Sequence, residues 1–138
     1  MADWQLRELQ PSDYEAAMAL WNGCEGVRTD ESREEFGRIL VRNPGLCSAA
    51  VAEGRLVGAV LCCEDGRRGY LYHLGVQGDC RQQGIGSALV TRSLELLAQS
   101  GIARCSIHLI VGNEAGAAFW KQSGWRVRTD LMVLAIDL

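Results

Sequence analysis

The sequence has no hydrophobic run long enough to cross a membrane. A spanning helix needs roughly 20 consecutive apolar residues, and no stretch of this 138-residue chain approaches that length. The N-terminal residues Met1 to Gln5 also lack the basic start and the apolar run of a secretory signal. These absences argue against export and membrane insertion, so we expect a cytoplasmic location and no membrane partner.

The chain also has little positive charge. Its formal net charge is −3 and its pI is about 5.4, which removes the electrostatic attraction to phosphate backbones on which nucleic-acid-binding proteins depend. The only adjacent basic pair, Arg67-Arg68, is typical of a solvated turn. We therefore expect no nucleic-acid partner.

Patterns that would form metal sites or disulfides are missing as well. The chain has six cysteines, but none of them forms a Cys-x-x-Cys pair or stands at zinc-binding spacing from a histidine. We therefore expect free, buried thiols and no metal. With 48% apolar and 22% charged residues, the composition is that of an ordinary globular protein. The length suits a single domain spanning residues 1–138.

Hydrophobic periodicity predicts strands and helices that alternate along the chain. The expected strands are residues 4–9, 48–53, 56–63, 70–76, 103–111 and one or two within 125–138, and the expected helices are residues 11–23, 31–41, 85–100 and 113–122. A two-residue turn at Gly54-Arg55 would join the second and third strands. The expected fold class is α/β or α+β, with a mixed, mostly antiparallel sheet of six to seven strands flanked by about four helices.

The segment Arg81-Gln82-Gln83-Gly84-Ile85-Gly86 joins the fourth strand to the longest helix. In such a segment, backbone N–H groups and a helix N-terminus converge on an anion, and glycines let a phosphate approach the main chain. Ser87-Ala88 follow where an ATP-binding P-loop needs Lys and then Ser or Thr, and Gln82 occupies the first glycine position of the dinucleotide motif. The pattern therefore favours the pyrophosphate of another ligand. A plain strand-to-helix turn is the alternative.

Two motifs resemble the GNAT superfamily of acetyltransferases. The first is the pattern Arg/Gln-x-x-Gly-x-Gly/Ala at residues 81–86, after a strand that ends Leu74-Gly75-Val76. The second runs from Asn113 to Trp125, where the family has Asn, then a helix with an aromatic residue, then Gly-Phe or Gly-Tyr. The order of elements agrees as well, and the general pattern is similar to small bacterial members of the YpeA type and to ribosomal-protein N-terminal acetyltransferases. The resemblance implies a single GNAT-type domain that transfers an acetyl group from acetyl-CoA to a primary amine.

The same resemblance implies which residues bind the donor. Backbone groups of Leu74 and Val76 would pair with the pantetheine arm in a gap between the fourth and fifth strands, and N–H groups from Gln82 to Ser87 would surround the pyrophosphate. The implied acetyl-CoA-binding residues are Leu74, Gly75, Val76, Arg81, Gln82, Gln83, Gly84, Ile85, Gly86, Ser87, Asn113 and Trp120.

Acetyl transfer needs a base for the amine, a donor to the oxyanion and a proton for the departing thiolate. We expect His108 to be the base, because an imidazole titrates near neutral pH. The related enzymes carry a glutamate at this place, and a histidine satisfied within the sheet is the alternative. Period-2 alternation puts Tyr72 on one face with Leu74 and Val76. There it would bind water, steer the amine or protonate the thiolate. A tyrosine of the core is the alternative. His73 would face the other way unless a bulge turns it.

Trp120 departs from the family pattern. Many relatives carry a tyrosine there as the acid for the leaving thiol, and an indole N–H cannot take that role. The thiolate then leaves unaided or with help from another group. The departure also leaves open a second function, a non-catalytic acyl-CoA sensor.

The acceptor and the oligomeric state stay open at this stage. A small-molecule amine and a protein or peptide amine are both compatible with the sequence. The apolar segment Met132–Leu138 would allow a homodimer that pairs at a sheet edge.

Overall fold

The computed structural model describes residues 3–138 and divides the chain into two compact units. The first unit is Met1–His108 and the second is Leu109–Leu138. The first unit holds the whole sheet and residues 81–86, which we call the Gly-rich segment, so most of the predicted site residues belong to it.

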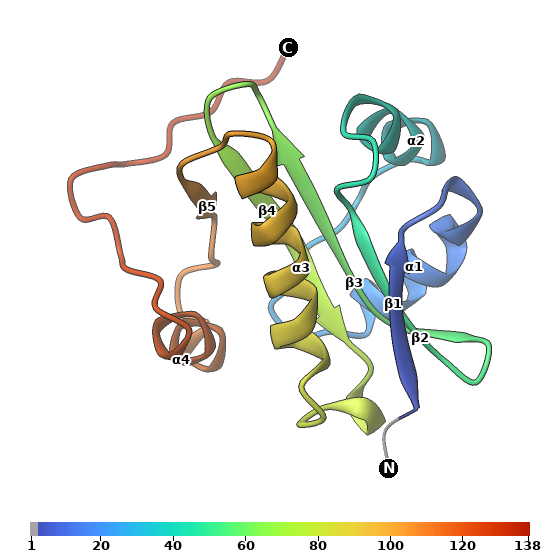
Figure 1. The fold of residues 1–138 in the computed structure, drawn as a ribbon. Coiled ribbons are helices and arrows are strands. Elements are labelled where there is room, and N and C mark those ends of the chain that lie inside the picture. The colour runs from blue at the N-terminus through green and yellow to red at the C-terminus, as the bar shows by residue number, and fades with distance from the viewer. Residues whose placement is uncertain (1–2) are drawn as a thin grey trace. The chain divides into compact units, whose positions relative to one another are not determined.

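The sheet has five strands in the order β1-β2-β3-β4-β5 (Figure 1). Strands β1 to β4 are antiparallel neighbours, and β5 runs parallel to β4. The strands are β1 (Trp4–Glu8), β2 (Ser48–Ala52), β3 (Arg55–Glu64), β4 (Gly69–Val76) and β5 (Cys105–Ile107). The mixed, mostly antiparallel arrangement agrees with the prediction.

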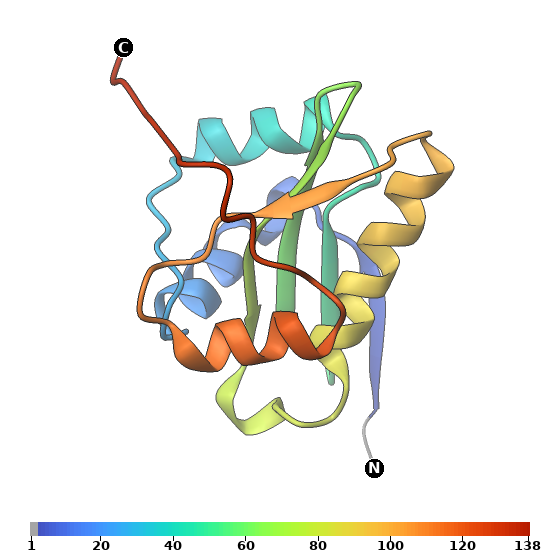
Figure 2. The same ribbon diagram turned by 90° about the vertical axis from the view of Figure 1, so that its left-hand side faces the viewer.

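Helices cover both faces of this sheet (Figure 2). A Cβ atom added at Gly58 would lie 2.9 Å from Ile85 of α3, whereas one added at Gly75 would lie 2.9 Å from Trp21 of α1. We call these two sides the α3 face and the α1 face. The helices of the first unit are η1 (Pro11–Asp13), α1 (Tyr14–Asn22), α2 (Arg33–Arg42), η2 (Gly78–Cys80) and α3 (Ile85–Gln99), of which η1 and η2 are short 3-10 helices.

The α1 face carries one cluster of core residues. Trp21 is completely buried there and packs near Phe36 of α2, with 6.4 Å between ring centroids. The helical spacing of apolar residues along α1 and α2 therefore aims both helices at the same face. The buried cluster consists of Leu9, Ala17, Leu20, Trp21, Phe36, Cys47, Ala49, Ala59 and Leu61.

The hairpin between β2 and β3 turns one residue earlier than predicted. The turn is Glu53-Gly54, and both residues have positive φ values, 52° and 75°. Two successive left-handed residues suit a tight two-residue hairpin, because their twist matches that of the strands. Arg55, which was expected in the turn, begins β3.

The second unit contains α4 (Glu114–Gln122) and, in residues 125–138, neither a helix nor a strand. The strands predicted for this segment are therefore wrong, and the described chain has five strands instead of six to seven. The expected fifth strand is also shorter, at Cys105–Ile107. The α/β class is nevertheless correct.

Candidate functional site

A β-bulge interrupts β4 at His73. Leu61 pairs with Tyr72 and Ala59 with Gly75, so β4 contains one residue more than β3 over this stretch. His73 takes up the extra residue with a φ of 57°, a left-handed value that is uncommon for a residue other than glycine. Its ring centroid lies 5.3 Å from that of Trp21, which puts the side chain on the α1 face.

The bulge overturns the predicted alternation of β4. Tyr72 packs against the core cluster on the α1 face, His73 follows it there, and Gly75 lies on the same side because its missing Cβ would meet Trp21. Tyr72 therefore does not share a face with Leu74 and Val76. A bulge shifts the side-chain alternation of every residue beyond it, and a period-2 pattern cannot reveal this.

One edge of β4 is left unpaired after the bulge. The β4–β5 ladder extends only from Gly69 to Leu71 on β4. Gln77 N donates to the carbonyl of Val57 on β3, over 2.7 Å. Since antiparallel strands alternate, this bond turns the backbone groups of Leu74 and Val76 away from β3 and toward the open side. In the described part of the chain, no strand pairs with them there.

The Gly-rich segment presents free backbone N–H groups at the start of α3. Gly84 is the N-cap residue, with a left-handed φ of 83° and no side chain to cap the helix. The first intrahelical bond that reaches back to it comes from Ala88 N, 3.0 Å from the Gly84 oxygen. The N–H groups of Ile85, Gly86 and Ser87 therefore lack intrahelical acceptors. Gln82 to Gly84 are exposed, so an anion has access to this positive helix end.

The ring of Tyr72, on the α1 face, contacts two imidazoles. Its ring centroid lies 6.4 Å from that of His108 and 6.5 Å from that of His73, both in edge contacts. Burial raises the pKa of the Tyr72 phenol, so the hydroxyl keeps its proton at neutral pH. The structure thus brings together the two predicted catalytic residues, His108 and Tyr72, and adds His73.

Sequence reasoning missed Glu31. We expected Glu31 to begin the second helix, but α2 begins at Arg33 with Ser32 as its cap. Glu31 lies in the loop and its Oε2 is 2.8 Å from Nε2 of His73. Thr29 donates to the other carboxylate oxygen, Oε1, over 2.6 Å. The available signal was the pair of acidic residues, Glu25 and Asp30, in the segment immediately before it.

These contacts keep Glu31 ionised although it is largely buried. The side chains of His73 and Glu31 are 15% and 20% exposed. Burial alone would raise the pKa of the Glu31 carboxyl, but the hydrogen bonds from Thr29 and His73 outweigh burial and hold that pKa below its usual range.

Asn113 and Trp120 belong to the second unit. Asn113 is the N-cap of α4, and its Oδ1 accepts from Gly116 N at 2.9 Å. Trp120 makes edge contacts with Phe119 and Trp125, with centroid distances of 5.1 and 4.9 Å. Within this unit, Asn113 therefore starts the helix and Trp120 packs it against the residue after the Gly124 turn.

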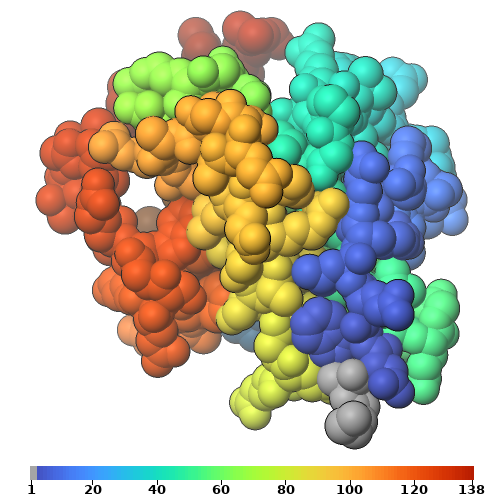
Figure 3. Space-filling model, viewed as in Figure 1, coloured from blue at the N-terminus to red at the C-terminus, as the bar shows by residue number. Residues whose placement is uncertain are grey.

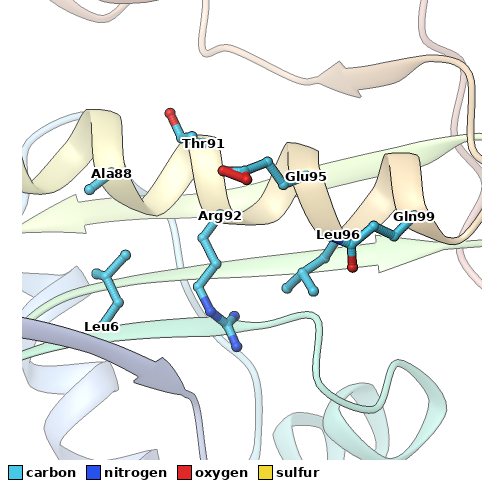
Figure 4. A pocket seen from close by; sticks show the side chains of 7 residues that line it. All are labelled: Leu6, Ala88, Thr91, Arg92, Glu95, Leu96 and Gln99. Atoms are coloured by element: carbon cyan, nitrogen blue, oxygen red, sulfur yellow. The ribbon is translucent and has the colours of Figure 1, made fainter.

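A groove of about 400 Å³ lies elsewhere, between α3 and β1. Figure 3 shows these two elements side by side on the surface, and Figure 4 shows the side chains that line the groove. Arg92, which lines the groove, donates a hydrogen bond from Nη1 to the Ser48 hydroxyl over 2.5 Å. The groove contains none of the predicted site residues; it is lined by Leu6, Ala88, Thr91, Arg92, Glu95, Leu96 and Gln99.

Residues 3–138 lack two further kinds of feature. In that range no group of three or more His, Cys, Asp or Glu side chains is placed to hold a metal ion. None of the helices formed there has the length and apolar character needed to cross a membrane.

Comparison with known proteins places these features in a family. A sequence model of the acetyltransferase (GNAT) family matches residues 4–125. An acetyltransferase of Pectobacterium atrosepticum is 34% identical over 114 residues, which cover 82% of this chain and 79% of that protein. An acetyltransferase of Yersinia enterocolitica is 29% identical over 130 residues, which cover 94% of this chain and 92% of that protein.

Solved structures agree on the fold. Ard1 from Thermoplasma volcanium superposes with a TM-score of 0.82 at 17% identity, covering 92% of this chain and 85% of that one. The PaiA N-acetyltransferase from Thermoplasma acidophilum, solved with coenzyme A, gives 0.80 at 19% identity, with 92% of each chain covered. Naa50 from Arabidopsis thaliana, solved with a bisubstrate analogue of coenzyme A and a peptide, gives 0.74 at 20% identity, with 92% and 85% covered.

Proposed function

We propose, because this chain belongs to the acetyltransferase (GNAT) family, that it transfers the acetyl group of acetyl-CoA to a primary amine. The observation that carries the proposal is the edge of β4 that has no partner strand, followed, after η2 and residues 81–84, by the free N-terminus of α3. The family match extends across both units, which supports one acetyltransferase domain over residues 1–138.

The donor side of the proposed site offers backbone hydrogen-bonding groups that acetyl-CoA can use. The backbone groups of Leu74 and Val76 would pair with the amides of the pantetheine arm, as a neighbouring strand would. The N–H groups from Gln82 to Ser87 would hold the pyrophosphate at the positive end of α3. Arg81 already donates from Nε to the Val76 carbonyl over 3.2 Å, which ties the loop to the end of β4. Asn113 and Trp120, in the second unit, stay predicted acetyl-CoA-binding residues.

The acceptor side has the groups that the chemistry needs. The amine nitrogen attacks the thioester carbonyl carbon, the C–S bond breaks, and the electron pair leaves on sulfur. His108 accepts a proton from the amine, and Tyr72, held protonated by burial, would steer the amine or return a proton to the thiolate. Trp120 cannot supply that proton.

The acceptor is an amine of a small molecule or of a peptide. The structural neighbours include Naa50 with its peptide analogue, an aminoglycoside acetyltransferase and an N-acetylglutamate synthase. These three proteins act on chemically different amines, so the shared fold does not select among them.

A non-catalytic acyl-CoA sensor is the second candidate. Trp120, where many relatives carry a tyrosine, favours it. A sensor would bind acetyl-CoA and release no thiol with any amine, and His108→Ala would change nothing.

Thiol release from acetyl-CoA tests the proposal. The acceptors would be spermidine, kanamycin, glutamate and the peptide Ala-Ala-Ala, each assayed with wild type and His108→Ala, with calorimetry of acetyl-CoA binding beside them. We expect amine-dependent release whose kcat falls about 10²-fold or more in the variant, with unchanged acetyl-CoA affinity. Binding without release in wild type supports the sensor, and absence of binding contradicts the donor site.

A further inference from the structure

The overall reaction must remove two protons from the acceptor nitrogen. A primary amine is an ammonium ion with three N–H bonds at neutral pH, whereas the amide product has one. The departing thiolate can take at most one of the two protons. A transferase of the proposed kind therefore gains from a second proton acceptor beside the first.

The structure supplies a second imidazole on the same face as the first. The imidazoles of His108 and His73 both contact the ring of Tyr72, with centroid distances of 6.4 and 6.5 Å. The bulge is responsible, because it turns His73 from its regular strand position onto the α1 face, at the cost of a left-handed φ of 57°. Backbone strain of this kind is typically kept where a side chain must be aimed.

Glu31 fixes which nitrogen of His73 carries the proton. An ionised carboxylate only accepts hydrogen bonds, so Nε2 must be the protonated nitrogen at the 2.8 Å contact with Oε2. This leaves the lone pair of a neutral ring on Nδ1. A carboxylate that orients an imidazole and stabilises its protonated form is the arrangement of a general base with its orienting partner.

Glu31 is itself held from two sides. The Thr29 hydroxyl occupies Oε1 at 2.6 Å, and the Tyr14 hydroxyl donates to the Glu31 carbonyl over 2.7 Å. The pair joins residues 42 positions apart, which anchors the loop of residues 23–32 to the bulge.

We propose that Glu31 and His73 form a second proton-accepting dyad, in which Nδ1 of His73 accepts one of the two amine protons and Glu31 is its positioning residue. This inference rests on the proposed function. The other proton goes to His108, so that both imidazoles are protonated when the C–S bond has broken, and water then removes the protons.

The tautomer is tested without any acceptor. The chain contains two histidines, so a His108→Gln variant reports His73 alone in long-range ¹H–¹⁵N correlation spectra. We expect protonated Nε2 and unprotonated Nδ1 at neutral pH, and a loss of that preference when Glu31→Gln is added. A protonated Nδ1 in the otherwise intact chain overturns the dyad.

The chemistry is tested by thiol release with the same four acceptors. His73→Asn is the first variant, because Asn tolerates a positive φ. We expect kcat to fall about 10²-fold, with acetyl-CoA affinity unchanged by calorimetry. His73→Gly also permits the backbone conformation and leaves space in which added imidazole should restore much of the rate. Glu31→Gln should lower kcat, whereas the neighbouring exposed Asp30→Asn, with the same charge change, should not.

The outcomes separate the two proposals. No thiol release by wild type, although acetyl-CoA binds, contradicts the proposed function and this inference with it. Release by wild type that is unchanged in His73→Asn contradicts the dyad alone. A loss that imidazole does not restore, together with a lower melting temperature, shows that the pair only anchors the loop and also overturns the dyad.

Discussion

Gly75 lies between the two residues whose backbone would hold the donor, and it has no room for a side chain. An added Cβ would be 2.9 Å from Cδ1 of Trp21 and 3.0 Å from Sγ of Cys24. Trp21 cannot move aside easily, because it is completely buried. We therefore predict that Gly75→Ala lowers the free energy of unfolding by about 1–3 kcal/mol, the usual cost of overpacking a core. Urea denaturation would measure it.

Gly78→Ala is the matched control, three residues further on. No atom lies within 4 Å of its hypothetical Cβ, so we expect a change below about 0.5 kcal/mol. Equal effects of the two substitutions would contradict the packing argument. Since Gly75 sits between Leu74 and Val76, its variant should also bind acetyl-CoA more weakly, which calorimetry checks.

The sequence predicted the role of a residue only where the residues next to it form a recognisable motif. The segment from Arg81 to Gly86 is contiguous, so its role follows from the sequence around it. The contact between Glu31 and His73 joins positions 42 residues apart through an extra residue in one strand. No local pattern encodes such a contact, and it was therefore missed.

The element α2 offers a prediction about helix propensity. Gly37 lies inside the helix, and an added Cβ would meet no atom within 4 Å. Because glycine loses more backbone freedom on folding than alanine does, we predict that Gly37→Ala raises the free energy of unfolding by about 0.5–1 kcal/mol. Thermal denaturation followed by circular dichroism would detect the higher melting temperature.

The cap of the same helix gives the opposite change. The Ser32 hydroxyl accepts from Glu35 N at 3.1 Å, and the Glu35 carboxylate accepts from Ser32 N at 2.9 Å. Removing the hydroxyl in Ser32→Ala should cost about 1 kcal/mol. If both substitutions moved the melting temperature in the same direction, local helix energetics would not explain α2.

Elements were predicted well where the sequence marks both their burial and their ends. Helix α3 has a buried side and an exposed side, whereas β2 and β3 are continuous apolar runs that are buried on both faces and separated by a glycine-containing turn. The predicted strands within residues 125–138 failed for a different reason. An apolar extended segment becomes a strand only when another strand pairs with it, and hydropathy alone does not supply that partner.

At the scale of the whole molecule, two largely buried carboxylates couple folding to pH. Asp13 accepts from Arg7 at 2.7 and 3.0 Å and from Gln10 N at 2.8 Å. Burial alone would raise the pKa of the Asp13 carboxyl, but these hydrogen bonds hold it below its usual range. The pKa of Glu31 is likewise lowered. A lowered pKa stabilises the folded state above the ordinary carboxyl pKa of about 4, and this stabilisation is lost as the pH falls through the lowered value.

We therefore predict that the free energy of unfolding decreases as the pH is lowered from about 5 to 3, and that Asp13→Asn makes this decrease smaller. The asparagine amide cannot ionise, so the variant should be less stable than wild type at neutral pH, and the difference should narrow in acid, where Asp13 becomes protonated. We expect a difference of only about 1–2 kcal/mol at neutral pH, because part of the Arg7 contact is exposed to solvent. Urea denaturation at a series of pH values measures how steeply the free energy of unfolding changes with pH in wild type and in Asp13→Asn. Glu34→Gln, on the exposed side of α2, is the control and should keep the wild-type slope. If wild type and Asp13→Asn lost stability in parallel, Asp13 would not be one of the groups that link folding to pH.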